Sequence, residues 1–125
     1  MERHILVVDD DGDVRDTIIA MLVENGFLAT AASGGVDMRD ILAADAASID
    51  AIVLDSLMPG ESSAALALHA KATSIPVVMI SGSPDRMKFA EDNGLQLLLK
   101  PFHVVELIQA VENAIVSGQF GQRDA

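Results

Sequence analysis

Short apolar runs alternate along the chain with longer stretches in which hydrophobic residues recur every three or four positions. Short continuous runs are typical of strands buried on both faces, and the periodic stretches are typical of amphipathic helices. The runs predict five strands, at residues 4–9, 27–32, 50–55, 76–81 and 95–99. The periodic stretches predict five helices, at residues 13–25, 35–45, 61–72, 84–92 and 103–117. This alternation indicates an α/β fold, a doubly wound parallel sheet with helices on both faces.

Local signals support several of these helices. Asn25-Gly26 is a typical helix end, and Ser83 followed by Pro84 is a typical helix start. In the third helix the hydrophobic face is expected at Ala64, Ala65, Leu68 and Ala72. In the last helix one stripe is expected at Val104, Leu107, Ile108, Val111 and Ile115.

The chain has 125 residues, which suits one domain with a substantial core. Half of the residues are hydrophobic but only 3% are aromatic, so aliphatic side chains and methionine must fill that core. Gly118 follows the last helical stripe and is expected to end the helix. We therefore expect one domain over residues 1–118 and a short flexible tail over 119–125.

Charge and cysteine content narrow the classes of function. With 19 acidic and 8 basic residues the formal net charge is −11, which disfavours direct binding to the phosphates of a nucleic acid. The sequence has no cysteine, which excludes disulfides and thiolate metal sites and is compatible with a reducing cytoplasm. No apolar run approaches the roughly 20 residues needed to span a bilayer. We expect a cytoplasmic protein without a signal peptide and without membrane contact.

Polar side chains stand where four of the predicted strands end. Asp9 and Asp10 close the first strand, and Asp55 closes the third. Ser81 closes the fourth strand and Lys100 the fifth. Because parallel strands place their carboxyl ends at one edge of a sheet, we expect these five side chains to gather there.

Such a cluster suits a divalent cation and a phosphoryl group. Three neighbouring carboxylates repel one another unless a cation neutralises them or one takes up a proton. Oxygen ligands with open positions suit Mg²⁺. Asp55 can serve there as metal ligand, nucleophile or both, and Lys100 can hold a phosphate.

Each residue also has a structural interpretation. Adjacent aspartates after a strand often form a turn or cap a helix, and Ser81 can simply begin a turn. Lys100 can form a structural ion pair. A calcium-binding loop beginning at Asp9 is excluded, because Val14 stands where that loop needs glycine and Ala20 where it needs glutamate.

Four segments, taken together, resemble the receiver (phosphoacceptor) domain of two-component response regulators. The segments are Val7-Val8-Asp9-Asp10, Leu54-Asp55-Ser56-Leu57-Met58-Pro59-Gly60, Ile80-Ser81-Gly82 and Lys100-Pro101-Phe102. Their order and spacing agree with that family, and the resemblance covers about residues 3–117. It implies a flavodoxin-like sheet of five strands in the order 2-1-3-4-5, and a stand-alone single-domain regulator.

The resemblance also implies a Mg²⁺ site. Asp10 would bind the ion directly, and Asp9 would act largely through a water molecule. The side chain of Asp55 and the backbone carbonyl of Leu57 would complete the protein ligands.

The same resemblance implies a phosphorylation site at Asp55, with Ser81 and Lys100 contacting the phosphoryl oxygens. The donor would be a phosphohistidine on a sensor histidine kinase or a histidine phosphotransfer protein. Ser81 and Ser83 would then move, changing a protein-binding surface around the fourth helix, fifth strand and fifth helix. A downstream protein would recognise that surface, and a homodimer is a second possibility. The chain would be no enzyme beyond catalysing its own phosphorylation and dephosphorylation.

Two of the positions that depart from the common receiver pattern bear on its function. Leu97 stands where an aromatic residue usually swings inward, so the usual aromatic coupling is not expected. Leu57 is apolar where polar or long side chains are common, and we hypothesise that it shields the acyl phosphate from water.

Two alternative functions stay open. One is a receiver-like scaffold that binds partners without phosphorylation, which the loss of the aromatic at Leu97 favours. The other is an aspartate-based phosphatase. The common form of that enzyme needs a second aspartate where Leu57 stands, which argues against it.

Overall fold

The structure, a computed structural model, describes residues 2–57 and 62–123, except for the side chains of residues 119–123. The five strands are β1 (His4–Val8), β2 (Leu28–Ala32), β3 (Ala51–Asp55), β4 (Val77–Ser81) and β5 (Gln96–Leu99). The five α-helices are α1 (Gly12–Glu24), α2 (Gly35–Asp45), α3 (Ser63–Ala72), α4 (Met87–Asp92) and α5 (Val104–Arg123). Two 3₁₀ turns add η1 (Ala46–Ser48) and η2 (Pro84–Arg86). The predicted alternation of strands and helices is confirmed.

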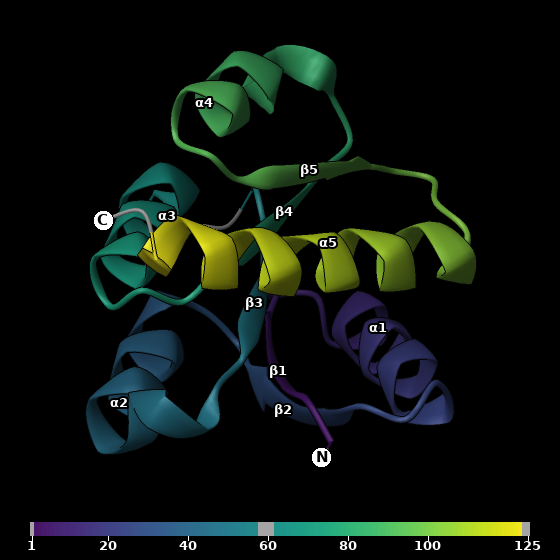
Figure 1. Cartoon of the computed structure of the whole chain (residues 1–125). Helices are drawn as coiled ribbons and strands as arrows, with labels where there is room; N and C mark the ends of the chain where they lie inside the picture. The colour runs from purple at the N-terminus through teal and green to yellow at the C-terminus, as the bar shows by residue number, and fades with distance from the viewer. Residues whose placement is uncertain (1, 58–61, 124–125) are drawn as a thin grey trace.

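All neighbouring strands are parallel, in the order β2-β1-β3-β4-β5, which confirms the predicted topology. One hydrophobic core lies between the sheet and helices α1 and α5, and a second lies between the sheet and helices α2 and α3 (Figure 1). Every residue of β3 and β4 is buried, as expected for strands covered on both faces. The paired registers Asp55–Ile80 and Ser81–Leu99 bring the carboxyl ends of β3, β4 and β5 to one edge.

Helix α3 presents a different face to the core than predicted. Its buried residues are Ser63, Leu66, Ala67 and Ala70, whereas Leu68 is 45% exposed. The start of the helix sets this face, since the Ser63 hydroxyl donates a 2.6 Å hydrogen bond to the Asp55 carbonyl. An alanine-rich helix has apolar side chains on several sides, so its hydrophobic pattern alone does not select one.

Helix α5 continues to Arg123, so the predicted end at Gly118 is wrong. No proline follows Gly118, and an isolated glycine weakens a helix without ending it. Gly118 instead marks a close approach: a Cβ at this position would lie 3.1 Å from the Pro76 side chain. Residues 119–123 of the predicted tail are therefore helical.

The helix start predicted at Ser83 and the helix end predicted at Asn25-Gly26 agree with the structure. Ser83 accepts a hydrogen bond from the Asp85 N–H at 3.3 Å, as its predicted capping role requires. The segment after it begins as the 3₁₀ turn η2 and continues as α4. Gly26, just past α1, has a φ of 90°, a conformation that glycine adopts readily. Across the ranges described, no helix has the length and apolar character needed to cross a membrane.

Candidate functional site

Three carboxylates meet at the carboxyl edge of the sheet, as the sequence predicted. Asp9 and Asp55 are buried, with 2% and 7% of their surfaces exposed, whereas Asp10 is exposed. One carboxylate oxygen from each of the three lies within 4.8 Å of the others. The group is therefore open to solvent on the side of Asp10 and closed on the side of the core.

The turn between β1 and α1 fixes Asp9. Its N–H donates to the carbonyl of Ala32 at 3.1 Å, and its Oδ1 accepts the N–H of Asp11 at 2.9 Å. Asp11 caps α1, because its Oδ1 accepts the N–H groups of Asp13 and Val14 at 3.0 and 3.2 Å. The helix cap is thus Asp11, not the preceding pair of aspartates.

Burial raises the pKa of Asp9 above its ordinary value of 3.8. The N–H of Asp11 and the charge of Lys100 lower it, whereas the charges of Asp55 and Asp10 raise it further. A raised carboxyl pKa means that the folded protein binds this proton more tightly than the unfolded chain does. The ionised Asp9 therefore opposes folding when no cation is bound.

We predict that Asp9→Asn raises the unfolding temperature of the metal-free protein at neutral pH. The gain should shrink as the pH falls toward 3.8, because wild-type Asp9 is then protonated and no longer opposes folding. Thermal unfolding followed by circular dichroism at several pH values measures it. The prediction fails if the gain is the same at every pH or if the variant is less stable.

Lys100 contacts the third carboxylate. Its Nζ lies 3.5 Å from Asp55 Oδ1, and its backbone N–H donates to the Ser81 carbonyl at 2.8 Å. The Lys100–Pro101 peptide bond is cis. The Asp55 side chain does not cap α3, because Ser62 does so by accepting the Ala65 N–H at 3.1 Å. The carboxylate of Asp55 thus faces the lysine and the other two acids.

Ser81 lies at the same edge and is buried, but its hydroxyl is engaged in the following turn. Its Oγ donates to the Ser83 carbonyl at 2.7 Å and accepts the Ser83 N–H at 3.1 Å. The structure therefore gathers the three acids and Lys100, and it shows Ser81 in the turn that its structural interpretation predicted.

The two departures from the receiver pattern lie in different surroundings. Leu57 is 75% exposed, two residues beyond Asp55. Leu97 is partly buried and packs, like Phe89 of α4, against the core on the α2 and α3 side of the sheet. The motif residues Met58, Pro59 and Gly60 lie outside the described residues.

One residue that contacts the site was not predicted from the sequence. Arg15 of α1 donates from Nη1 to the Asp9 carbonyl at 2.9 Å. A usable signal exists, because Arg15 is the only lysine or arginine between Arg3 and Arg39 and lies within a run of aspartates.

The sequence also matches a known protein family. Residues 5–112 match the family described as the response regulator receiver domain. The chain belongs to this receiver family. Receiver domains of two-component response regulators are phosphorylation-based signalling switches, and membership supports the same class of function for this receiver domain.

Curated relatives of the receiver domain are longer proteins. It is 31% identical to the transcriptional regulatory protein GltR of Pseudomonas aeruginosa, covering 96% of this chain and 52% of GltR. It is 32% identical to Protein PetR of Rhodobacter capsulatus, covering 90% of this chain and 48% of PetR. The chain thus spans about half the length of these relatives.

Solved structures match over nearly the whole receiver domain. A response regulator receiver domain protein from Clostridium thermocellum has a TM-score of 0.85 at 28% identity, covering 94% of this chain and 98% of that one. A receiver protein from Sinorhizobium medicae has a TM-score of 0.81 at 28% identity, covering 94% and 97%.

Proposed function

We propose that this receiver domain accepts a phosphoryl group on Asp55 from a phosphohistidine of a sensor histidine kinase or a histidine phosphotransfer protein. One observation carries the proposal: in a member of the receiver family, Asp9, Asp10 and Asp55 converge within 4.8 Å, with Lys100 3.5 Å from Asp55. Asp55 is assigned as phosphoacceptor because the resemblance to receiver domains implies it, and its position at the end of β3, beside the acids and the lysine, supports that assignment.

The residues present fit Mg²⁺. The donors are all oxygen, their spacing allows one ion to contact them together, and the exposed Asp10 leaves a path from solvent. Burial, with a smaller effect from the charges of Asp55 and Asp10, raises the pKa of Asp9, so a bound cation would stabilise its ionised form. We assign the ligands to the side chains of Asp9, Asp10 and Asp55 and the backbone carbonyl of Leu57. When bound, the ion supplies positive charge to the phosphoryl oxygens.

Asp55 is suited to the transfer itself. A carboxylate oxygen attacks phosphorus, an O–P bond forms, and the P–N bond of the donor breaks with its electron pair staying on the imidazole nitrogen. Lys100 is close enough to pair with a phosphoryl oxygen on Asp55, so positioning and positive charge are what the protein contributes. The burial of Asp55 limits the access of water to the product.

Ser81 links this site to helix α4. Its hydroxyl holds both backbone groups of Ser83, and Ser83 in turn caps the 3₁₀ turn that leads into α4. If the Ser81 hydroxyl turns to a phosphoryl oxygen, Ser83 loses these bonds and the start of α4 is released. This route needs no aromatic residue at Leu97.

We predict that Ser81→Ala leaves Asp55 able to accept phosphate but uncouples α4. Hydrogen exchange over residues 83–92 should increase on phosphorylation in the wild type and change little in the variant. Thr73→Ala is a matched control, since Thr73 Oγ1 also bonds a backbone carbonyl, that of Ala70, but follows α3. An equal phosphorylation-dependent change in Ser81→Ala would contradict this coupling.

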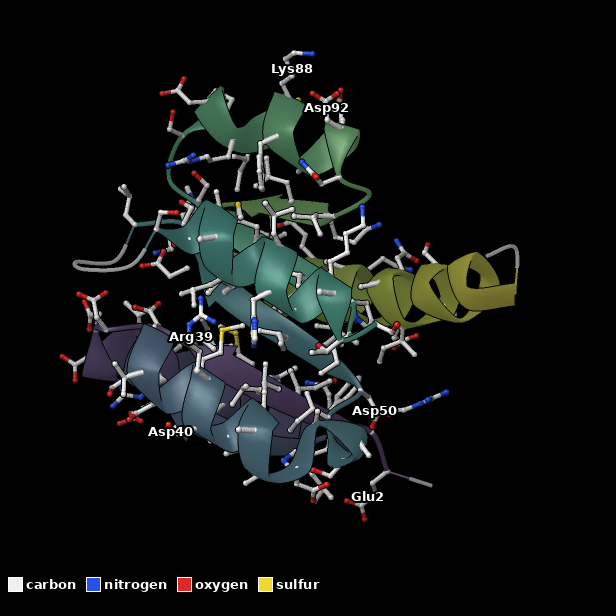
Figure 2. The ribbon with its side chains drawn as sticks, turned by 90° about the vertical axis from the view of Figure 1, so that its left-hand side faces the viewer. Glu2, Arg39, Asp40, Asp50, Lys88 and Asp92 are labelled. Carbon is white, nitrogen blue, oxygen red and sulfur yellow. The ribbon has the colours of Figure 1, made fainter. Side chains whose placement is uncertain are left out.

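The surface of α4, β5 and α5 is suited to a downstream protein. It carries exposed hydrophobic side chains, namely Met87, Leu99, Val104 and Val105. Lys88 and Asp92 form a 3.3 Å ion pair on the outer side of α4 (Figure 2). A mixed apolar and charged surface of this kind fits a protein partner, which can be a target protein or a second copy of the chain.

Leu57 is expected to slow the hydrolysis of the acyl phosphate on Asp55. We predict that Leu57→Asn shortens the half-life of phosphorylated Asp55, because an amide can hold water beside the acyl phosphate and leucine cannot. Leu57→Met, which stays apolar and of similar size, is the control. Decay of the phosphorylated protein after removal of the donor gives the rate, and equal half-lives for leucine and asparagine would refute the shielding role.

Incubation with acetyl phosphate and Mg²⁺ tests the proposed function. Intact-mass measurement should show one labile phosphoryl group per chain, and chelation of Mg²⁺ should prevent its formation. Without an adduct, a receiver-like scaffold becomes the better description. Release of many equivalents of phosphate from added phosphate esters would instead favour the aspartate-based phosphatase, whereas the proposal requires only self-phosphorylation and self-dephosphorylation.

A further inference from the structure

The side chain of Arg15 contacts the turn between β1 and α1. Its Nη1 donates a 2.9 Å hydrogen bond to the backbone carbonyl of Asp9. The Asp9 N–H donates on the other side to the carbonyl of Ala32, which ends β2. The main chain of Asp9 is therefore held between β2 and a guanidinium that comes from α1.

The orientation of this guanidinium leaves one of its buried donors without a hydrogen bond within the described residues, which is energetically unfavourable. Arg15 is partly buried, and its Nε is a buried donor without a hydrogen-bond partner in the part of the chain that the structure describes. Leaving a buried donor unpaired is unfavourable. Because the guanidinium is planar and its donors form a rigid fork, the bond from Nη1 to the carbonyl also fixes the position of Nε. The contact with Asp9 thus explains an orientation that burial alone disfavours.

Arg15 acts on the main chain of Asp9 more than on its carboxylate. Burial and neighbouring carboxylates raise the pKa of Asp9, and the charge of Arg15 is not among the causes of that shift. The charge of Arg15 instead makes a minor contribution to lowering the pKa of Asp37 in α2, which hydrogen bonds from Ser33 mainly lower. A role in fixing the geometry of the turn fits these observations better than neutralisation of the site.

We propose that Arg15 is a positioning residue for the cation site, holding the β1–α1 turn in the form that presents Asp9 and Asp10 toward Asp55. This inference rests on the proposed function, because it assigns Arg15 a task in binding Mg²⁺. Two of the three carboxylates belong to the turn that Arg15 holds, whereas Asp55 ends β3 and its lysine partner follows β5. Loss of Arg15 therefore weakens cation binding and leaves the acceptor carboxylate in place.

The test compares Arg15→Met and Arg15→Lys with the control Arg3→Met. Arg3 precedes β1 at the opposite end of the sheet, so its loss removes the same charge without touching the turn. Calorimetric titration with Mg²⁺ alone, without a phosphate donor, should show about tenfold weaker binding in Arg15→Met. Arg15→Lys should recover part of the loss, because an ammonium group can donate to one carbonyl, and Arg3→Met should match the wild type.

A second measurement separates positioning from a general loss of structure. With acetyl phosphate, Arg15→Met should need about tenfold more Mg²⁺ for half-maximal phosphorylation, with a maximal rate close to that of the wild type. The proposal is overturned if Arg15→Met binds Mg²⁺ as tightly as the wild type does. It is also overturned if only the maximal rate falls.

Each variant is first checked for folding by circular dichroism, and if Arg15→Met is unfolded the Arg15→Lys comparison decides. In that case, Mg²⁺ binding by Arg15→Lys that is weaker than that of the wild type supports the proposal. Wild-type affinity for Mg²⁺ in Arg15→Lys contradicts it. If the wild-type protein itself binds no Mg²⁺, the proposed function fails, an outcome distinct from failure of the role of Arg15 alone.

Discussion

Asp55→Asn is expected to leave no detectable phosphoryl adduct after incubation with acetyl phosphate and Mg²⁺. Asparagine keeps the size and planarity of the side chain but has no anionic oxygen to attack phosphorus. The fold should persist, because the backbone carbonyl that accepts the Ser63 hydroxyl is unchanged. Intact-mass measurement gives the result directly, and circular dichroism shows whether the variant is folded.

Asp50→Asn is the matched control for this prediction. Asp50 precedes β3 at its other end, where its Oδ2 accepts the His4 N–H at 2.8 Å. This variant should be phosphorylated like the wild type, since its carboxylate lies away from the acid cluster. Persistent labelling of Asp55→Asn at the wild-type level would place the phosphoacceptor elsewhere and remove the main assignment of the site.

Leu54→Ala is expected to lower the free energy of unfolding by about 2–5 kcal/mol. Leu54 lies in the central strand β3, is fully buried, and belongs to the core on the α2 and α3 side of the sheet. Truncation removes its apolar contacts and leaves a cavity that the packed sheet cannot fully close. Since a domain of this size is stable by about 5–15 kcal/mol, the loss is a large part of the total.

Leu57→Ala makes the matched comparison, because it is the same substitution three residues later. Leu57 is 75% exposed, so its truncation should change the free energy of unfolding by no more than about 0.5 kcal/mol. Urea unfolding followed by circular dichroism measures both variants. Equal stability losses would mean that the described burial of β3 is wrong.

The strands were predictable because buried parallel strands produce continuous apolar runs with a clear start and end, whereas their order was implied by the resemblance to receiver domains. The face of α3 was not predictable in the same way. Its sequence offers alanines on several sides, and the hydrogen bond between the Ser63 hydroxyl and the Asp55 carbonyl selects the buried one. That bond joins residues of two different elements, so a periodic pattern within the helix carries no trace of it.

In the candidate site, too, some residues were predictable from the sequence and others were not. Asp9, Asp10, Asp55 and Lys100 were predictable because strand ends in a parallel sheet must lie at one edge. The contact between Arg15 and the Asp9 carbonyl depends on the path of a long side chain back across a turn, which sequence spacing does not specify. The hydroxyl of Ser81 has a partner within its own turn and potential partners across the edge, and the sequence does not specify which of them it contacts.

The close approach of Gly118 to Pro76 limits which residues can stand at this position of α5. A Cβ at position 118 would lie 3.1 Å from the side chain of Pro76, directly before β4, so the ring or the helix would have to shift by a few tenths of an ångström. Such a displacement would start at the end of the sheet remote from the acid cluster. Substitution at this position would therefore change the packing of α5 against the start of β4 without contacting the acid cluster.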